Sequence, residues 1–372
     1  MRQPFSVLIL DGESEFALFA AHCLARCPNV KIYALCESPW SPIRFSRYCR
    51  CITFKKSTKD DETILRTLAN IVDENGIDVL LPTETKGISF AIDHREALSK
   101  FVSIPPLPDK KSFEIANDKW LLSRFLAENG IPGPKTVLVT EDILENRLQD
   151  LEFPVLLKPT CACGGEGIIP FDHSTVLRRY LETLDLEELR GRFILQPYLP
   201  GTVAGFNALS IQGEIIAMTM QRGIIPNTQK FAAAGAIEFI KDINLLEACS
   251  NLCSAFAWSG YANIDVLYDS RDQKVNILDL NARFWGSLRG SLAVGVNFPY
   301  LACLAALNIP FPRPDYDLGN YFHSKTALKL GLFKSFRKDP KRRVSVQETG
   351  LTFLLLDPLG EMIRAFQQEV FQ

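Results

Sequence analysis

Hydrophobic and polar residues alternate along two neighbouring stretches of the chain, residues 261–268 and 275–283. A period of two is typical of a β-strand with one buried face. Polar residues 269–272 separate the stretches, so the pattern predicts a β-hairpin with a turn centred on Asp272. One face of this hairpin is apolar and is predicted to lie in the core; it holds Ala262, Ile264, Val266, Tyr268, Leu278, Leu280, Ala282 and Phe284.

The opposite face of the hairpin carries polar side chains. If the turn is symmetric, Asp265 lies opposite Asp279. Asn263 then lies opposite Asn281, and Arg283 follows on the same face. Opposed aspartates repel each other, and Mg²⁺ relieves that repulsion because it prefers carboxylate and carbonyl oxygens. Beyond the metal, Arg283 is expected to hold a phosphate or carboxylate. A solvent-facing hairpin that carries acids by chance is the alternative.

The first hundred residues alternate between strand and helix patterns. Strands are expected at 6–10, 31–36 and 78–81, with helices at 15–27 and 61–75. This rhythm predicts a Rossmann-like parallel sheet with helices on both faces. Ligands bind at the carboxyl edge of such sheets, so residues 44–47 and the run Thr83, Glu84 and Thr85 are candidates for substrate contact. Ordinary helix capping is the competing role.

The prolines at 105, 106 and 108 mark a linker, and the chain is divided into residues 1–108, 109–196 and 197–372. The fold class expected is α/β followed by α+β. The later elements are predicted as helices 118–129, 174–184, 245–258 and 300–307, strands 136–139, 155–158, 192–196, 204–211 and 214–220, an irregular segment 222–235, and a less regular tail.

Composition fits an ordinary globular protein, with 47% hydrophobic and 23% charged residues in 372. The net charge of −2 gives no general attraction to nucleic acid or membrane. No apolar stretch approaches a spanning helix, and the first apolar run is too short for a signal sequence. The ten cysteines lack paired zinc spacing, so reduced thiols in a cytoplasmic protein are expected. The role of a basic cluster at 334–343 stays open.

Two lysines are candidates for phosphate binding. Lys158 ends an apolar strand, where an ammonium needs an anion to offset its desolvation. The Gly-rich turn that follows includes Gly164, Gly165 and Gly167, whose backbone N–H groups can approach phosphate oxygens closely. Lys119 lies in the first turn of a helix, where the helix dipole disfavours a cation. Its partner is either Asp118 or solvent, or the α-phosphate of a nucleotide.

A short segment that contains two prolines is predicted to connect two lobes. It consists of Gln196, Pro197, Tyr198, Leu199 and Pro200. Its prolines lack N–H donors. The carbonyl of Pro197 and the N–H of Leu199 are therefore expected to pair with an adenine edge. A stiff hinge without ligand contacts is the alternative.

These features follow one another in a specific order: a helix-borne lysine, a strand-borne lysine with a Gly-rich loop, the Gln-Pro-Tyr-Leu-Pro-Gly hinge, and a hairpin ending Asp-Leu-Asn-Ala-Arg. In this order they resemble the ATP-grasp superfamily, and most of all its carbamoyl-phosphate-synthetase-like branch. The resemblance covers residues 110–310, and residues 1–108 look like the domain that precedes the grasp in these enzymes.

The resemblance implies that two lobes hold ATP together with Mg²⁺ or Mn²⁺. Lys119 and Lys158 would bind phosphates, with Gly164, Gly165 and Gly167 beside them. Gln196, Pro197, Tyr198 and Leu199 would bind adenine, and Asp265, Asp279 and Asn281 the metal. Arg283 matches the arginine of the family's Asn-Pro-Arg motif. It is therefore expected to stabilise the transferring phosphoryl group. Such positioning and charge are what phosphoryl transfer requires.

The chain departs from the family pattern at several positions. Asp279 stands where many members have glutamate, and Ala282 replaces a proline. The acidic residue that often follows the hinge glycine to bind ribose is missing after Gly201. Between the lobes, the segment 222–235 has the small residues of a mobile loop. We expect Arg222 to contact the acyl phosphate, while Lys230 either meets the acid substrate or lies on a surface loop.

The expected activity is that of an ATP- and Mg²⁺-dependent ligase, which activates a small carboxylic acid as an acyl phosphate and joins it to an amine, such as an amino acid. Two alternatives stay open: an enzyme that forms carboxyphosphate from bicarbonate, and a sensor that binds ATP without chemistry. Small molecules are the expected partners, and a homodimer is one option for assembly. The sequence names neither the acid nor the amine.

Overall fold

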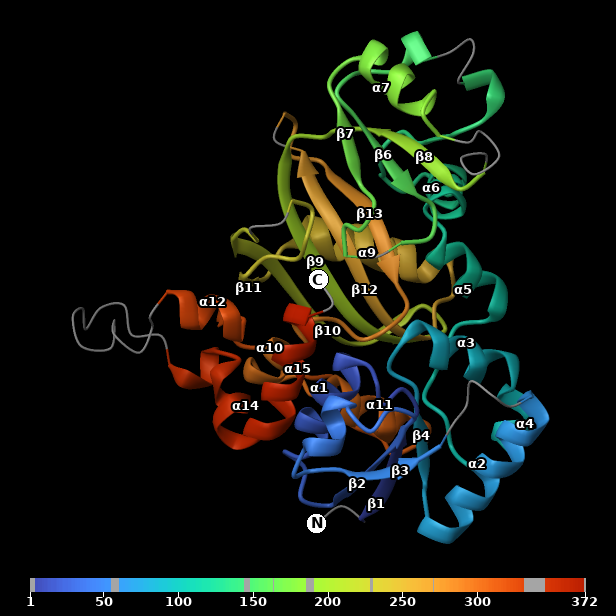
Figure 1. Ribbon diagram of the computed structural model, residues 1–372, viewed down its shortest axis with the longest axis vertical. Coiled ribbons are helices and arrows are strands. Elements are labelled where there is room, and N and C mark those ends of the chain that lie inside the picture. The colour runs from blue at the N-terminus through green and yellow to red at the C-terminus, as the bar shows by residue number, and fades with distance from the viewer. Residues whose placement is uncertain are drawn as a thin grey trace.

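A computed structural model of the protein describes most of the chain, namely residues 4–54, 60–143, 148–162, 164–184, 191–227, 230–269, 271–330 and 345–370. Figure 1 shows its three β-sheets following one another along the long axis of the molecule, with the N-terminal sheet at one end. The basic cluster at 334–343 lies outside the described residues.

The N-terminal sheet has the order β3-β2-β1-β4, and its neighbouring strands are parallel. Asp60 starts a helix by accepting the N–H of Thr63, and Gly76 ends that helix in the left-handed conformation. The expected parallel α/β unit is confirmed. Its elements are β1 (Phe5–Ile9), α1 (Glu15–Leu24), β2 (Val30–Cys36), η1 (Pro42–Phe45), β3 (Arg50–Thr53), α2 (Asp61–Asn75), β4 (Val79–Leu81), α3 (Thr85–Asp93) and α4 (Arg95–Leu98).

A second, antiparallel sheet has the order β5-β8-β6-β7 and lies at the far end of the molecule (Figure 1). Its apolar side chains form a core of their own, which includes Val155, Leu157 and Leu195. The elements of this region are α5 (Lys110–Asn117), α6 (Lys119–Glu128), β5 (Val137–Leu138), η3 (Leu148–Asp150), β6 (Val155–Pro159), β7 (Ile169–Phe171), α7 (Ser174–Leu181) and β8 (Phe193–Pro197).

A six-stranded sheet with the order β13-β12-β9-β10-β11-β14 lies between the other two. Helix α9 packs against β9, β10 and β13. The segment predicted to be irregular from residue 222 is strand as far as Ile225, so that prediction was wrong at its start. The elements are β9 (Gly201–Ile211), β10 (Glu214–Ile225), β11 (Ala236–Ile240), α9 (Ile243–Ala255), β12 (Gly260–Asp269), β13 (Val275–Asn281) and β14 (Gly319–Phe322).

The hairpin β12–β13 has the predicted register where its polar residues lie: Asp265 pairs with Asp279, and Asn263 with Asn281. Nearer the turn a β-bulge shifts the register, because Val266 pairs with Ile277. Consequently Ile277 is fully buried and Leu278 only half-buried. The prediction of a core position was therefore wrong for Leu278, and for Tyr268, which is also half-buried.

The described residues after β14 are mostly helical, so the prediction of a less regular tail was wrong for them. Helix α15 packs against η1, and α10 and α11 pack against α1. Within the described ranges, no helix combines the length and apolar character that crossing a bilayer requires. The elements are α10 (Leu288–Ala293), α11 (Phe298–Ala306), α12 (Ser324–Lys329), η5 (Val346–Glu348), α14 (Leu351–Leu356) and α15 (Pro358–Val370).

Candidate active site

Two opposed carboxylates lie at the centre of the candidate site. Asp265 on β12 and Asp279 on β13 are cross-strand partners. The amide of Asn281 donates to Asp265, with 3.3 Å between Nδ2 and Oδ2. Burial and the neighbouring charge of Asp279 raise the pKa of Asp265 to about 7. The protein alone therefore leaves this carboxylate pair short of positive charge.

Lys119, at the start of α6, reaches the carboxylate pair. Its Nζ lies 3.1 Å from Oδ2 of Asp279, and it also donates to the carbonyl of Ala162 at the start of the Gly-rich loop. Asp118, the other partner considered, instead caps α6 by accepting the N–H groups of Trp120 and Leu121. The structure thus brings Lys119 and Asp279 together.

Lys158, on β6, is buried and points toward the hinge. Its Nζ donates to Oε1 of Gln196 over 2.7 Å, and Nε2 of Gln196 donates to the hydroxyl of Thr136 over 2.8 Å. Burial lowers the pKa of Lys158 to about 8; the charge of Asp279 opposes this shift and that of Lys119 adds to it. An anion placed here would relieve the desolvation of the ammonium.

The Gly-rich loop owes its shape to glycine. Gly164, Gly165 and Gly167 have φ values of 66°, 83° and 70°, which disfavour side chains. At Gly165 a Cβ atom would lie 2.5 Å from the carbonyl oxygen of Phe231. The loop therefore lies against the segment after β10, which carries Lys230 on the surface. Cys163, within the loop, lies outside the described residues.

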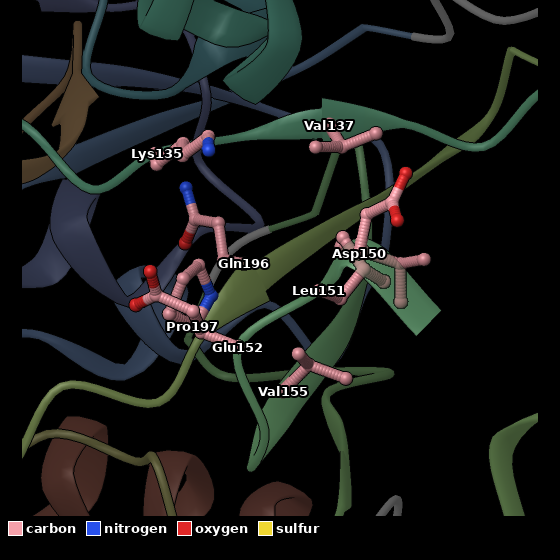
Figure 2. A pocket seen from close by; sticks show the side chains of 9 residues that line it. Lys135, Val137, Asp150, Leu151, Glu152, Val155, Gln196 and Pro197 are labelled. Carbon is pink, nitrogen blue, oxygen red and sulfur yellow. The ribbon is translucent and has the colours of Figure 1, made fainter. Parts of the chain in front are cut away.

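The hinge continues directly from β8. Tyr198 is exposed, and its N–H donates to the carbonyl of Pro154 over 2.8 Å. Beside Gln196 and Pro197 there is a hollow, shown with its side chains in Figure 2. Lys135 and Glu152 also line it. This hollow is far too small for an adenine ring, so the adenine contacts of the hinge stay a prediction.

Arg283 follows β13 and has a partner on each of its sides. Nη2 lies 3.4 Å from Oδ1 of Asn281, Nη1 donates to the carbonyl of Phe284 over 2.8 Å, and Nε lies 3.5 Å from Oε1 of Glu84. The guanidinium also stands 4.8 Å from the ring centre of Phe16. Arg283 thus joins the metal-ligand candidates to the carboxyl edge of the N-terminal sheet.

Arg222 is not brought to this site. Asp265 pairs with Gly205, and Gly205 pairs with Gln221, so Gln221 shares the face of the aspartates. Arg222 is the next residue and points to the opposite face, where it forms an ion pair of 2.8 Å with Glu238. The sequence interpretation treated residues 222–235 as irregular and so did not extend the alternation of β10 to Arg222. That alternation places Gln221 and Arg222 on opposite faces of the sheet.

Sequence reasoning missed Gln221, whose Oε1 accepts the hydroxyl of Ser287 over 2.9 Å. It also missed a buried polar chain behind the aspartates. Asn263 donates to Asn207 over 2.9 Å, and Asn207 donates to Thr219 over 3.3 Å. Thr219 lies 3.0 Å from the hydroxyl of Ser291 on α10. The polar residues Thr219 and Gln221, at alternate positions of β10, were the available signal.

The donor set at the aspartates fits Mg²⁺. It consists of two carboxylates and Asn281, whose amide oxygen faces Arg283 in this structure and would have to turn toward the metal to bind it. Burial contributes most to the raised pKa of Asp265 and the charge of Asp279 adds to it, so a bound cation would stabilise the ionised carboxylates. Among the described residues there is no group of three or more His, Cys, Asp or Glu side chains arranged for a metal. The remaining ligands would therefore come from water and substrate, as is common for Mg²⁺.

A family model described as an ATP-grasp domain matches residues 116–287. These residues form an ATP-grasp domain. The match includes both lysines, the Gly-rich loop, the hinge, the acidic hairpin and Arg283. The resemblance seen in the sequence is therefore confirmed at the level of the superfamily.

Known proteins resemble this chain over half of its length or more. It is 24% identical over 341 residues to the D-aspartate ligase of Enterococcus faecium, covering 84% of this chain and 80% of that ligase. It is 26% identical over 198 residues to the tetrahydromethanopterin:alpha-L-glutamate ligase of Methanocaldococcus jannaschii, covering 52% of this chain and 66% of that enzyme.

A solved structure shows the same fold. The biotin carboxylase domain of the Hydrogenobacter thermophilus 2-oxoglutarate carboxylase, in complex with MgADP, ADP and bicarbonate, superposes with a TM-score of 0.63 at 15% identity. The likeness covers 86% of this chain and 74% of that chain. It therefore extends beyond the ATP-grasp match to the parts of the chain on either side.

Proposed function

We propose that the protein is an ATP- and Mg²⁺-dependent ligase that joins a small carboxylic acid to an amine through an acyl phosphate. One observation carries the proposal: the opposed pair Asp265 and Asp279 lies in contact with Lys119 on one side and is joined through Asn281 to Arg283 on the other. Such a cluster of ligands and cations suits a triphosphate and its metal.

The residues take the following roles. Asp265, Asp279 and Asn281 would hold Mg²⁺, which supplies charge neutralisation at the phosphates when bound. Lys119 and Lys158 bind phosphate oxygens together with the N–H groups of the Gly-rich loop. The backbone of the hinge, Pro197 to Leu199, binds adenine, with Gln196 and Tyr198 beside it. We also propose the domain division 1–108, 109–196 and 197–372.

The reaction has two steps. A carboxylate oxygen of the acid attacks the γ-phosphorus of ATP, the bond to the β-γ bridging oxygen breaks, and ADP leaves. The amine then attacks the acyl carbon, inorganic phosphate leaves with the bonding electrons, and the amine loses a proton. Arg283 holds the phosphoryl oxygens during both steps, because its guanidinium can bind two of them at once.

The relatives support an amino acid as one substrate. The D-aspartate ligase and the alpha-L-glutamate ligase are named for amino acids that carry a second carboxylate. A dicarboxylic amino acid would supply either the acid to be activated or the attacking amine. We therefore place aspartate and glutamate, in both enantiomers, first among the acids to be tested.

Hydroxylamine trapping tests the proposal. The protein is incubated with ATP, Mg²⁺, hydroxylamine and one acid at a time, and both hydroxamate and ADP are measured. We expect hydroxamate with one acid or a small group of related acids, because hydroxylamine replaces the natural amine. ADP formation that depends on bicarbonate alone would instead support a carboxyphosphate-forming enzyme. ATP binding without ADP under every condition would support a sensor.

A further inference from the structure

We propose that Glu84, at the carboxyl edge of the N-terminal sheet, is a positioning residue that orients the guanidinium of Arg283 for phosphoryl and acyl transfer. The inference rests on the proposed function, because it gives the N-terminal unit a part in the chemistry of the ATP-grasp site. The contact between Glu84 and Arg283 can also be tested without measuring turnover.

Glu84 is held firmly at its own end. It is the N-cap of α3, and its Oε1 accepts the N–H and the hydroxyl of Thr85 over 3.0 and 3.2 Å. Its other oxygen, Oε2, accepts the hydroxyl of Ser14 over 3.3 Å. Ser14 in turn caps α1 by accepting the N–H of Phe16. The carboxylate is thus fixed between the first turns of two helices.

The backbone beneath Glu84 is fixed as well. Asp11 follows β1 and accepts the N–H groups of Thr83 and Glu84 over 2.8 and 3.1 Å. This arrangement needs a glycine at position 87, because a Cβ atom there would lie 2.3 Å from Asp11 oxygens. The carbonyl of Thr83 lies 3.4 Å from the N–H of Phe284. The loop after β13 is therefore tied to the same turn that carries Glu84.

Arg283 contacts both the N-terminal unit, through Glu84, and the acidic hairpin, through Asn281. Glu84 lies at its Nε, Asn281 lies at its Nη2, and Nη1 donates to the carbonyl of Phe284, so each nitrogen of the guanidinium has a partner and Glu84 is the charged one. The ring of Phe16 covers its face. Only 12% of its side chain is exposed, against 31% for Glu84. Because a guanidinium is planar, fixing Nε and one Nη sets the direction of the remaining N–H groups.

This arrangement predicts a specific loss when the Glu84 charge is removed. Glu84→Gln keeps the length of the side chain and its acceptor oxygen for Thr85, so α3 stays capped. Its uncharged amide binds Nε less strongly, and Arg283 gains freedom to rotate. A group that is misplaced by about 1 Å costs up to about 100-fold in rate. Glu84 is not among the residues proposed to bind the metal or the nucleotide.

The experiment compares Glu84→Gln with wild type in the hydroxamate assay. We expect kcat to fall by about tenfold or more, with the KM for ATP and the thermal midpoint nearly unchanged. The matched control is Asp93→Asn, which alters an exposed carboxylate at the other end of α3. In the background of Arg283→Ala, the Glu84 substitution should have no further effect, because both act through one guanidinium.

A second measurement addresses the contact itself. In protein with ¹⁵N-labelled arginine, Arg283→Lys identifies the Nε–H signal of Arg283, which should shift in Glu84→Gln and not in Asp93→Asn. Unchanged kcat in Glu84→Gln, or equal losses with and without Arg283, would overturn the inference. If wild type forms no product with any acid, the proposed function fails, and an unmoved Nε–H signal would then separately refute the contact.

Discussion

Lys119 and Asp279 form an ion pair with 3.1 Å between Nζ and Oδ2, although one lies on helix α6 and the other on the acidic hairpin. The ammonium therefore neutralises a carboxylate that is proposed to bind metal. Both groups are largely shielded, at 11% and 19% exposure. Metal and nucleotide binding would exchange this pair for two new ones, lysine with phosphate and carboxylate with Mg²⁺.

This exchange predicts that Lys119→Met has opposite effects on two ligands. ATP affinity should fall by about 10- to 100-fold, because a charge-assisted hydrogen bond to phosphate contributes about 1.5–3 kcal/mol. Mn²⁺ affinity without nucleotide should rise at pH 8, because no ammonium then competes for Asp279. Calorimetry measures the first effect and Mn²⁺ titration by electron paramagnetic resonance the second. Lys110→Met, which removes an exposed lysine, is the control.

The metal assignment predicts the behaviour of the hairpin acids. Asp265→Asn or Asp279→Asn should reduce turnover by about 100-fold or more, because each replaces a charged metal ligand with a weaker neutral one. The Mg²⁺ concentration needed for half-maximal activity should rise in any variant that stays active. Asp272→Asn, at the exposed turn of the same hairpin, should behave like wild type. Normal turnover in both site variants would exclude the assignment.

The lowered pKa of Lys158 predicts how ATP binding depends on pH. The pKa of its ammonium is lowered from 10.5 to about 8 in the free protein, chiefly by burial. Phosphate oxygens beside it would raise that pKa again. Binding should therefore take up a proton above pH 8, and ATP affinity should fall as pH rises through 8. Calorimetry at pH 9 in two buffers with different protonation enthalpies measures this uptake.

Lys158→Arg provides the comparison, because arginine keeps its charge throughout this pH range. It should bind ATP without proton uptake at pH 9, even if its affinity differs from that of wild type. The absence of uptake in the wild-type protein would show that Lys158 is already protonated at pH 9, or that phosphate does not reach it.

The hairpin shows what the sequence makes predictable. A strict period of two sets which residues share a face, so the pairing of Asp265 with Asp279 followed directly from the alternation. The bulge near the turn did not, because residues 277 and 278 are both apolar and suit either face equally well. Register close to a polar group is thus better specified than register within an apolar run.

Contacts between distant parts of the chain were not predictable from spacing. Glu84 was one of several candidates at a sheet edge, and nothing in its neighbourhood indicated Arg283 as its partner. His22 and Asp357 lie 335 residues apart in sequence and 2.9 Å apart in space. Local patterns predict elements and faces, whereas such pairs depend on how complete units pack together.

The hydrogen-bonded polar side chains next to the aspartates predict that a substitution at Asn207 lowers the stability of the fold. Asn207 is fully buried and bonds to both Asn263 and Thr219. Asn207→Ala removes both bonds and leaves the buried Thr219 and the half-buried Asn263 without this partner, which should lower the free energy of unfolding by about 2–4 kcal/mol. Urea denaturation measures the change. Asn276→Ala, at a half-exposed position of the same sheet, should cost far less; equal losses would contradict the prediction.

The C-terminal helix predicts a second effect on stability. Glu361 on α15 is buried and paired with both Arg289 and Arg364. Burial alone would raise the pKa of Glu361, but the two guanidinium groups outweigh it and lower the pKa to about 2. Glu361→Gln leaves Arg289 buried without its charged partner, so the free energy of unfolding should fall by about 3–5 kcal/mol at pH 7.

The pH dependence of this effect follows from linkage. Because its pKa is lower in the folded state, Glu361 stabilises the protein above the ordinary pKa of 4.5 and loses that contribution as pH falls toward 2. The difference in unfolding free energy between wild type and Glu361→Gln should therefore shrink between pH 4.5 and pH 2. Denaturation at several pH values measures it, with exposed Glu247→Gln on α9 as the control. A difference that stays constant over this range would show that the carboxylate charge does not stabilise the contact between α15 and α10.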